Sequence, residues 1–324
     1  MNEDAVKVSQ INPWTALPSL RLIEALPLGS SAGSLLPCVF GLWALVLLSM
    51  TLSPPAAIAE RSVFAEVLPD AIVGIISDSR EIAVVGVGAG ITRILRLLIS
   101  VVVVGFVGTA VSRSAGMRFC RDPGTGAIQS LVHASRLWKS TLLTSGLFGL
   151  LSFMSLLPFR IVAGLFFVAS GSGDTTHVFS IVVWAAALTL MIAMFICAVG
   201  WLLSLASVGV DRCGGAESLS RGISYVLSRF WRTTCYVGVV ILLSWLSGRV
   251  FEFILTQAAV LAEESINGDP RQTGPASTFL QVCSILVHSV RLSVFFSGLA
   301  ISYVLLRHFE DNVSLQETDS GSIS

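Results

Sequence analysis

The chain has 324 residues, of which 54% are apolar and 12% are charged. Soluble domains carry about twice that share of charged residues. The polar residues of this chain are too few to cover so large an apolar core in water, so the composition excludes a soluble protein. It predicts an integral membrane protein. Because the formal net charge is zero, the sequence gives no reason to expect a nucleic-acid partner.

Residues 1–34 precede the first long apolar run and are predicted to form a cytoplasmic or interfacial segment. Trp14–Leu28 is apolar but interrupted by Pro18 and Pro27, which favours at most a short helix at the membrane surface. A cleaved signal peptide is the competing interpretation of the run that follows, because Ala57-Ile58-Ala59 resembles a processing site. The long segment before the run favours an uncleaved first helix, since the charged start of a signal peptide is shorter.

Six apolar runs are each long enough to cross about 30 Å of hydrocarbon as a helix. They span residues 35–52, 91–112, 141–168, 178–209, 234–258 and 280–306. The predicted fold class is therefore all-α, a polytopic bundle of six transmembrane helices over residues 35–307. The polar residues 308–324 that follow are predicted to form a disordered cytoplasmic tail.

The loops between these runs alternate in charge. The 113–140 loop has five basic residues against one acid, and the 210–233 loop has four against two. The 53–90 loop instead has five acidic residues against two basic ones, and the 261–278 loop has three against one. Since basic loops stay in the cytoplasm, we predict six spans with both termini cytoplasmic.

One seven-residue pattern occurs twice, each time just before an apolar run. Residues 135–141 are Ser-Arg-Leu-Trp-Lys-Ser-Thr, and residues 228–234 are Ser-Arg-Phe-Trp-Arg-Thr-Thr. A tryptophan followed by a cation is typical of an interfacial anchor, because the indole lies at headgroup depth while the cation stays in water. We therefore expect four anchor residues, Trp138, Lys139, Trp231 and Arg232.

Each copy of the pattern ends a segment with apolar residues at steps of three or four. Over 216–230 these residues are Ala216, Leu219, Ile223, Val226 and Phe230, and 126–139 repeats the spacing less regularly. We expect two amphipathic helices on the cytoplasmic surface with their apolar faces toward lipid. We also expect an internal parallel repeat, around 91–168 and 178–258. The alternative is that any cytoplasmic loop beside a membrane gathers Trp and Arg.

The segment from Asp211 to Arg232 contains Gly-Ala-Glu-Ser-Leu-Ser-Arg at 215–221 and Phe-Trp-Arg at 230–232. It resembles the inner amphipathic segment of uncharacterised six-helix bacterial inner-membrane proteins. The order of an acidic residue, a Ser-Arg pair and Trp-Arg gives a looser similarity to the membrane domain fused to some glycerophosphodiester phosphodiesterases. The resemblance covers most of 91–307 in outline. It implies a six-helix fold and a bacterial inner-membrane location, and it implies no catalytic residues.

Four arginines are predicted to lie near the outer edge of the hydrocarbon: Arg96, Arg160, Arg249 and Arg291. Each is about 16 to 21 residues, or roughly 24–32 Å along a helix, from a cation at the inner boundary. A ring of guanidinium groups inside the bundle would bind an anion or a lipid headgroup, with Glu252 neutralising one member. The alternative is snorkelling, in which each arginine reaches outer-leaflet phosphates separately.

The sequence has no pattern typical of metal or covalent chemistry. The six cysteines show no CxxC spacing and the four histidines no HxxxH spacing, so we expect no metal site, no cofactor and no catalytic residue. The expected partners are the lipid bilayer and its anionic headgroups. The expected function is organisational or lipid-interacting. The alternative is a small transporter or channel for an anionic solute or lipid headgroup, which would use the arginine ring; a third possibility, a membrane enzyme, would need a nucleophile.

Overall fold

The structure is a computed structural model and describes residues 18–52, 87–120, 126–151, 154, 176–266 and 274–311. Every regular element within these residues is a helix, as predicted. In chain order the elements are η1 (Pro18–Glu24), α2 (Ala25–Gly29), α3 (Ala32–Leu52), α7 (Val87–Phe119), α8 (Ala127–Arg136), α10 (Thr176–Asp211), α11 (Gly215–Ser228), α12 (Phe230–Ile266) and α13 (Gly274–Asp311). A further helix, which we call the 138–151 helix, lies between α8 and α10.

Within the residues that the structure describes, four helices are long and apolar enough to cross a membrane, namely α7, α10, α12 and α13. A fifth span results if α3 is taken together with the preceding short helix, from which it is bent by 64°. These helices cover five of the six predicted runs. The structure describes only the start of the remaining run, as part of the 138–151 helix. Because α13 extends to Asp311, the predicted disordered tail cannot begin at 308.

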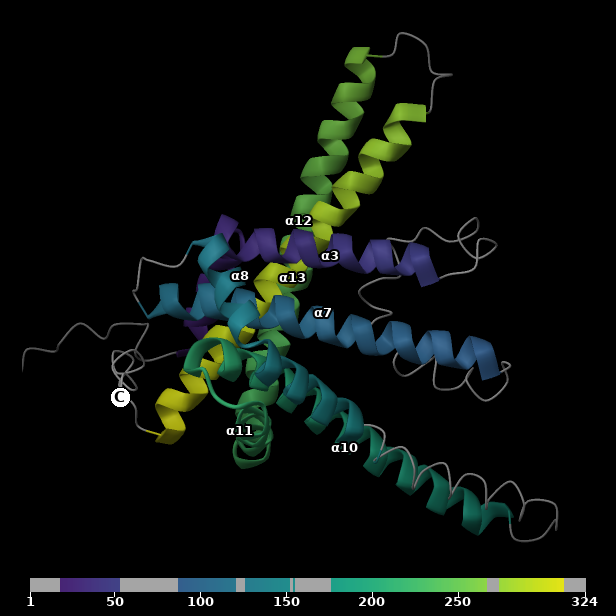
Figure 1. Ribbon diagram of the computed structural model, residues 1–324, viewed down its shortest axis with the longest axis vertical. Helices are drawn as coiled ribbons and strands as arrows, with labels where there is room; N and C mark the ends of the chain where they lie inside the picture. The colour runs from purple at the N-terminus through teal and green to yellow at the C-terminus, as the bar shows by residue number, and fades with distance from the viewer. Residues whose placement is uncertain are drawn as a thin grey trace, which may run out of the picture.

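The helices converge at one end of the molecule and spread apart at the other (Figure 1). The convergent end contains α8, α11 and the C-terminal end of α13, while α3, α7 and α10 fan out from it. The central helix is α13, since 89% of its apolar window is buried. Its residues Phe296, Leu299 and Tyr303 are almost fully buried and share one core with Val111 of α7 and Leu205 of α10. Both predicted basic loops therefore belong to the convergent end.

Glycines lie where helices cross closely. A Cβ atom on Gly222 of α11 would lie 2.2 Å from the carbonyl oxygen of Gly200 in α10. A Cβ atom on Gly209 of α10 would lie 2.7 Å from the carbonyl oxygen of Thr109 in α7. Between helices in a membrane, lipid is as apolar as the side chains, so close backbone approach through small residues supplies much of the packing energy.

The segment η1–α2 packs against α13. Leu22 and Ala25 are fully buried, and the hydroxyl of Ser293 in α13 donates a 2.6 Å hydrogen bond to the carbonyl oxygen of Gly29. Pro27 is tolerated because it lies in the first turn of α2, where backbone N–H groups have no intrahelical partner to lose. The cytoplasmic or interfacial position of residues 1–34 stays a prediction, and the structure adds that Pro18–Gly29 packs on α13.

The helix predicted at 216–230 is present as α11, but its apolar face packs against protein. Leu219 and Val226 are 5% and 0% exposed, because α11 crosses α10 at the Gly222–Gly200 contact. The prediction that Leu219 faces lipid is therefore wrong. The helix predicted at 126–139 is present as α8, which buries Ala134 and Ser130 and packs against α7 and α3.

Candidate functional site

Two of the four predicted arginines meet between α12 and α13. The Arg249 Nη1 atom lies 3.2 Å from Glu252 Oε2, and the Arg291 Nη2 atom lies 3.0 Å from the same oxygen. We call these three side chains the Arg–Glu–Arg cluster. Because two cations share one carboxylate, these three side chains together carry a net charge of +1.

The cluster lies well inside both apolar segments. Arg249 is nine residues from the end of the span Phe230–Ala258, and Arg291 is eight residues from the start of the span Cys283–His308. These separations correspond to roughly 12–13 Å along a helix. A charge within an apolar segment of this kind is costly unless it is paired, and Glu252 provides the pairing.

Gly248 makes room for Arg291. A Cβ atom on Gly248 would lie 1.9 Å from the Nε atom of Arg291, so the arginine side chain lies directly on the glycine backbone. This Nε atom is buried and has no hydrogen-bond partner in the described part of the chain. The Ser244 hydroxyl donates a 2.7 Å hydrogen bond to the Arg291 carbonyl oxygen, and the Arg249 guanidinium lies 5.6 Å from the centre of the Trp245 ring. Contacts from both helices therefore position the cluster.

The other two predicted arginines are not described to the same extent. Arg96 belongs to α7, and its side chain lies outside the part that the structure describes, as does the whole of Arg160. Away from the convergent end, α7 and the α12–α13 pair point in different directions (Figure 1). The observed cluster is therefore built on α12 and α13.

Both copies of the seven-residue pattern form a corner between two helices. Leu137 separates α8 from the 138–151 helix, and Arg229 separates α11 from α12. A threonine hydroxyl donates to a carbonyl at each corner, from Thr141 to Leu137 at 3.3 Å and from Thr233 to Tyr225 at 3.2 Å. These bonds occupy carbonyl groups near the helix breaks, but they come from different positions of the pattern, since Thr141 is its seventh residue and Thr233 its sixth.

The predicted anchor residues at these corners point away from the core. Trp138 is 51% exposed and Trp231 is 78% exposed, and Lys139 and Arg232 are exposed beside them. The Lys139 Nζ atom lies 6.0 Å from the centre of the Trp138 ring. This geometry agrees with an indole at headgroup depth beside a hydrated cation.

A second charged group joins three helices at the convergent end, and the sequence interpretation missed it. Asp211, the last residue of α10, accepts hydrogen bonds from Arg307 and Tyr303 of α13 and lies 3.6 Å from Arg221 Nη1 of α11. The Asp211 side chain is only 6% exposed. The Tyr303 hydroxyl oxygen also lies 3.1 Å from Ser207 Oγ. We call this group the Asp211 centre.

The helix dipole explains why Asp211 needs two arginines. The C-terminal end of a helix carries partial negative charge, so a carboxylate in the last turn of α10 is unfavourable unless cations compensate it. In the sequence, Asp211 contributes only to the loop charge count. Two features of the sequence could have indicated the Asp211 centre. Asp211 lies in the last turn of an apolar span, and Tyr303 and Arg307 are four residues apart and so share one face of α13.

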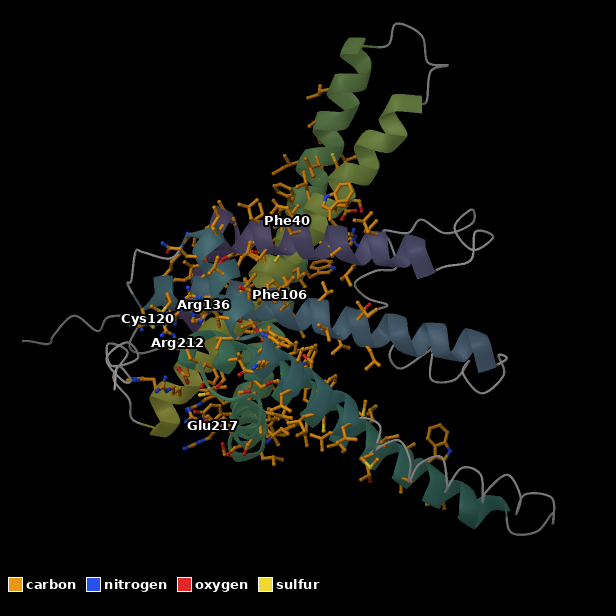
Figure 2. The ribbon with its side chains drawn as sticks, in the orientation of Figure 1. Phe40, Phe106, Cys120, Arg136, Arg212 and Glu217 are labelled. Carbon is orange, nitrogen blue, oxygen red and sulfur yellow. The ribbon has the colours of Figure 1, made fainter. Side chains whose placement is uncertain are left out.

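The convergent end is basic around His133 of α8, where Arg136 and Arg212 also lie (Figure 2). Burial, followed by the positive charges of Arg113, Arg212 and Arg136, lowers the pKa of His133 to about 4. The imidazole is therefore neutral at neutral pH. Arg212 adopts a left-handed backbone conformation, with φ of 57°, in the turn between α10 and α11.

No three His, Cys, Asp or Glu side chains in the described residues are arranged to hold a metal ion. Comparison of the chain with protein-family models, with curated proteins and with solved structures finds no match. The Arg–Glu–Arg cluster, the Asp211 centre and the corners at Trp138 and Trp231, which we call the first and second Trp corner, are therefore the features from which a function can be inferred.

Proposed function

We propose that the protein has an organisational, lipid-interacting role in a membrane rather than a catalytic one, and that the Arg–Glu–Arg cluster binds an anionic lipid headgroup. The observation that carries the proposal is the convergence of Arg249 and Arg291, from two helices, on one oxygen of Glu252. Guanidinium groups bind phosphate oxygens in pairs and keep their charge when partly desolvated. A headgroup phosphate would compensate the remaining positive charge.

The exposure of the cluster favours a ligand that arrives from the lipid. The Arg249 and Glu252 side chains are 56% and 46% exposed, so they face the outside of the helix pair rather than an enclosed pathway for a solute. Simple snorkelling needs no shared carboxylate, because each arginine would reach the headgroups alone. The carboxylates of Glu252 and Asp211 are both engaged by guanidinium groups, which argues against either acting as a general base.

Replacing both arginines of the cluster is expected to abolish the preference for anionic lipid. The double variant Arg249→Gln/Arg291→Gln should lose roughly 25-fold in phosphatidylglycerol binding relative to phosphatidylcholine, because each cation near an anionic lipid contributes about fivefold. Native mass spectrometry of the purified protein in nanodiscs of the two lipids measures this ratio. An unchanged ratio would show that the cluster is not a headgroup site.

Four further variants separate geometry from net charge: Gly248→Ala, Gly238→Ala, Arg136→Gln and the single change Arg249→Gln. Gly248→Ala keeps every charge but displaces Arg291, and is expected to lower the ratio severalfold. Gly238→Ala, on the same helix, adds a Cβ with nothing within 4 Å and should leave the ratio unchanged. Arg136→Gln removes an exposed cation at the convergent end, away from the Arg–Glu–Arg cluster. If Arg136→Gln lowers binding as much as Arg249→Gln, net charge is responsible and the proposal is wrong.

The alternating loop charges support an orientation with the convergent end in the cytoplasm, and the resemblance to bacterial inner-membrane proteins implies that membrane. Single cysteines at positions 121 and 220, introduced after the six native cysteines are replaced, are expected to react with a membrane-impermeant maleimide only in inside-out vesicles. A cysteine at position 267, in an acidic loop, should react only in intact cells. Reaction at 121 or 220 from outside would contradict the six-span topology.

A further inference from the structure

An apolar groove runs along the 138–151 helix, starting at the first Trp corner. It has a volume of about 470 Å³, and its lining includes Trp138, Lys139, Leu142, Gly146 and Leu150. A Cβ atom on Gly146 would meet nothing within 4 Å. Leu142 and Leu150 are 37% and 53% exposed. The floor of the groove is therefore open, and apolar side chains form its sides.

The second copy of the seven-residue pattern provides an internal comparison. With Trp138 aligned to Trp231, Leu143 corresponds to Tyr236 and Leu147 to Val240. Tyr236 is 5% exposed and Val240 is 0% exposed, whereas Leu143 is 50% exposed. At these two positions protein covers α12, whereas in the described part of the chain Leu143 is half exposed and Leu147 is only partly buried. The positions of Trp138, Lys139 and Leu142 are exposed in both copies, so the difference lies at Leu143 and Leu147.

The dimensions and the charge of the groove match one lipid molecule. From Lys139 to Leu150 the helix rises about 16 Å, which is half of the roughly 30 Å hydrocarbon core, or the depth of one leaflet. The end of the groove at the Trp corner contains the Lys139 ammonium beside the Trp138 ring. Away from that end, the lining is leucine and glycine.

We propose that this groove holds one acyl chain of an anionic phospholipid from the inner leaflet, with the headgroup phosphate at Lys139. The Trp138 indole lies at the level of the glycerol and ester groups, where its N–H can donate to an oxygen. The chain lies over Gly146, where a side chain would block it. This site is separate from the Arg–Glu–Arg cluster, since it lies on a different helix and begins at the opposite end of the bundle.

Photolabelling of the whole protein tests the site. The probes are phosphatidylglycerol and phosphatidylcholine that carry a diazirine on one acyl chain, each incorporated in phosphatidylcholine nanodiscs, and the labelled residues are mapped by peptide mass spectrometry. The phosphatidylglycerol probe is expected to label residues 142–150 about fivefold more than the phosphatidylcholine probe. The change Lys139→Gln should remove that preference, because Lys139 is the cation among the described residues that line the groove.

Filling the groove tests the acyl chain directly. Gly146→Leu is expected to reduce labelling of 142–150 at least fivefold. Gly238→Leu adds the same bulk at another exposed glycine with nothing within 4 Å, and should change nothing. The double variant Arg249→Gln/Arg291→Gln should also leave this labelling intact. A failure of the Arg–Glu–Arg cluster as a headgroup site can therefore be distinguished from a failure of the groove as an acyl-chain site.

Two results would overturn the inference. Equal labelling by both probes, unaffected by Gly146→Leu or Lys139→Gln, would mean ordinary contact with bulk lipid. Protein–protein cross-links at 142–150, in place of lipid adducts, would mean that a second copy of the chain or another helix occupies the groove. If Gly146→Leu does not fold, the comparison of the two probes in the Lys139→Gln protein still decides between these outcomes.

Discussion

Asp211→Ala is expected to lower the apparent melting temperature of the protein by roughly 6–12 °C, which corresponds to about 3 kcal/mol. Removal of one partner from a buried ion pair costs about 3–5 kcal/mol, because the remaining charge is left buried without compensation. The lower end of that range applies here. The side chains of Arg307 and Arg221 are 20% and 38% exposed, so water or headgroups can partly hydrate them once Asp211 is gone.

The measurement uses the free cysteines of the protein. Cys38 is fully buried and Cys283 is 6% exposed, so a thiol-reactive dye reports their release when the protein in detergent or nanodiscs is heated. Melting of Asp211→Ala at the wild-type temperature would show that the Asp211 centre does not hold α10, α11 and α13 together.

Two neighbouring substitutions calibrate this result. Tyr303→Phe removes a buried hydroxyl that donates to Asp211 and should cost about 1 kcal/mol. Glu217→Ala removes a side chain that is 56% exposed and pairs with Arg221 across one helical turn, and should cost at most about 0.5 kcal/mol. We expect the loss of melting temperature to be largest for Asp211→Ala, smaller for Tyr303→Phe and smallest for Glu217→Ala. A Glu217→Ala effect as large as that of Asp211→Ala would mean that Arg221 itself, and not the buried carboxylate, is the important member.

The helical elements were largely predictable, whereas the partners of their apolar faces were not. Spacing of three or four between Leu219, Ile223 and Val226 predicts a helix, and α11 is that helix. The same spacing cannot distinguish lipid from protein as the partner, because both are apolar. The distinguishing residue is Gly222, whose lack of a side chain allows α11 to approach the backbone of α10.

For the charged groups too, contacts within one helix were predictable from the sequence, whereas contacts between helices were not. The pairing of Arg249 with Glu252 was predictable from a separation of three residues on one helix. The arrival of Arg291 at the same oxygen, from a residue 39 positions away, depends on how α12 and α13 pack. The Asp211 centre could not be assembled from spacing, because its partners come from two further helices that only the fold brings to the end of α10.

Gly222→Ala is expected to destabilise the protein by about 2 kcal/mol, which would lower the melting temperature by roughly 4–8 °C. The added Cβ would lie 2.2 Å from the carbonyl oxygen of Gly200 and 3.1 Å from the backbone nitrogen of Ser204. Both are backbone atoms of α10, so no side-chain rotation relieves the overlap. Because the overlap is with backbone, the upper end of the usual overpacking range, about 3 kcal/mol, applies. The gain in helix propensity from Gly to Ala, roughly 0.5–1 kcal/mol, then leaves a net loss of about 2 kcal/mol.

Two matched alanine substitutions make this prediction specific to the helix crossing. In Gly200→Ala the nearest atom to the new Cβ is the Ile223 side chain, at 2.8 Å, which can move, so a smaller loss is expected. In Gly238→Ala the new Cβ meets nothing within 4 Å, so only the helix propensity changes, and the melting temperature should stay the same or rise by a few degrees. The thiol-reactive dye assay compares all three variants under one condition. Equal melting of Gly222→Ala and Gly238→Ala would contradict close packing of α11 on α10, and would restore the possibility that the apolar face of α11 rests on lipid.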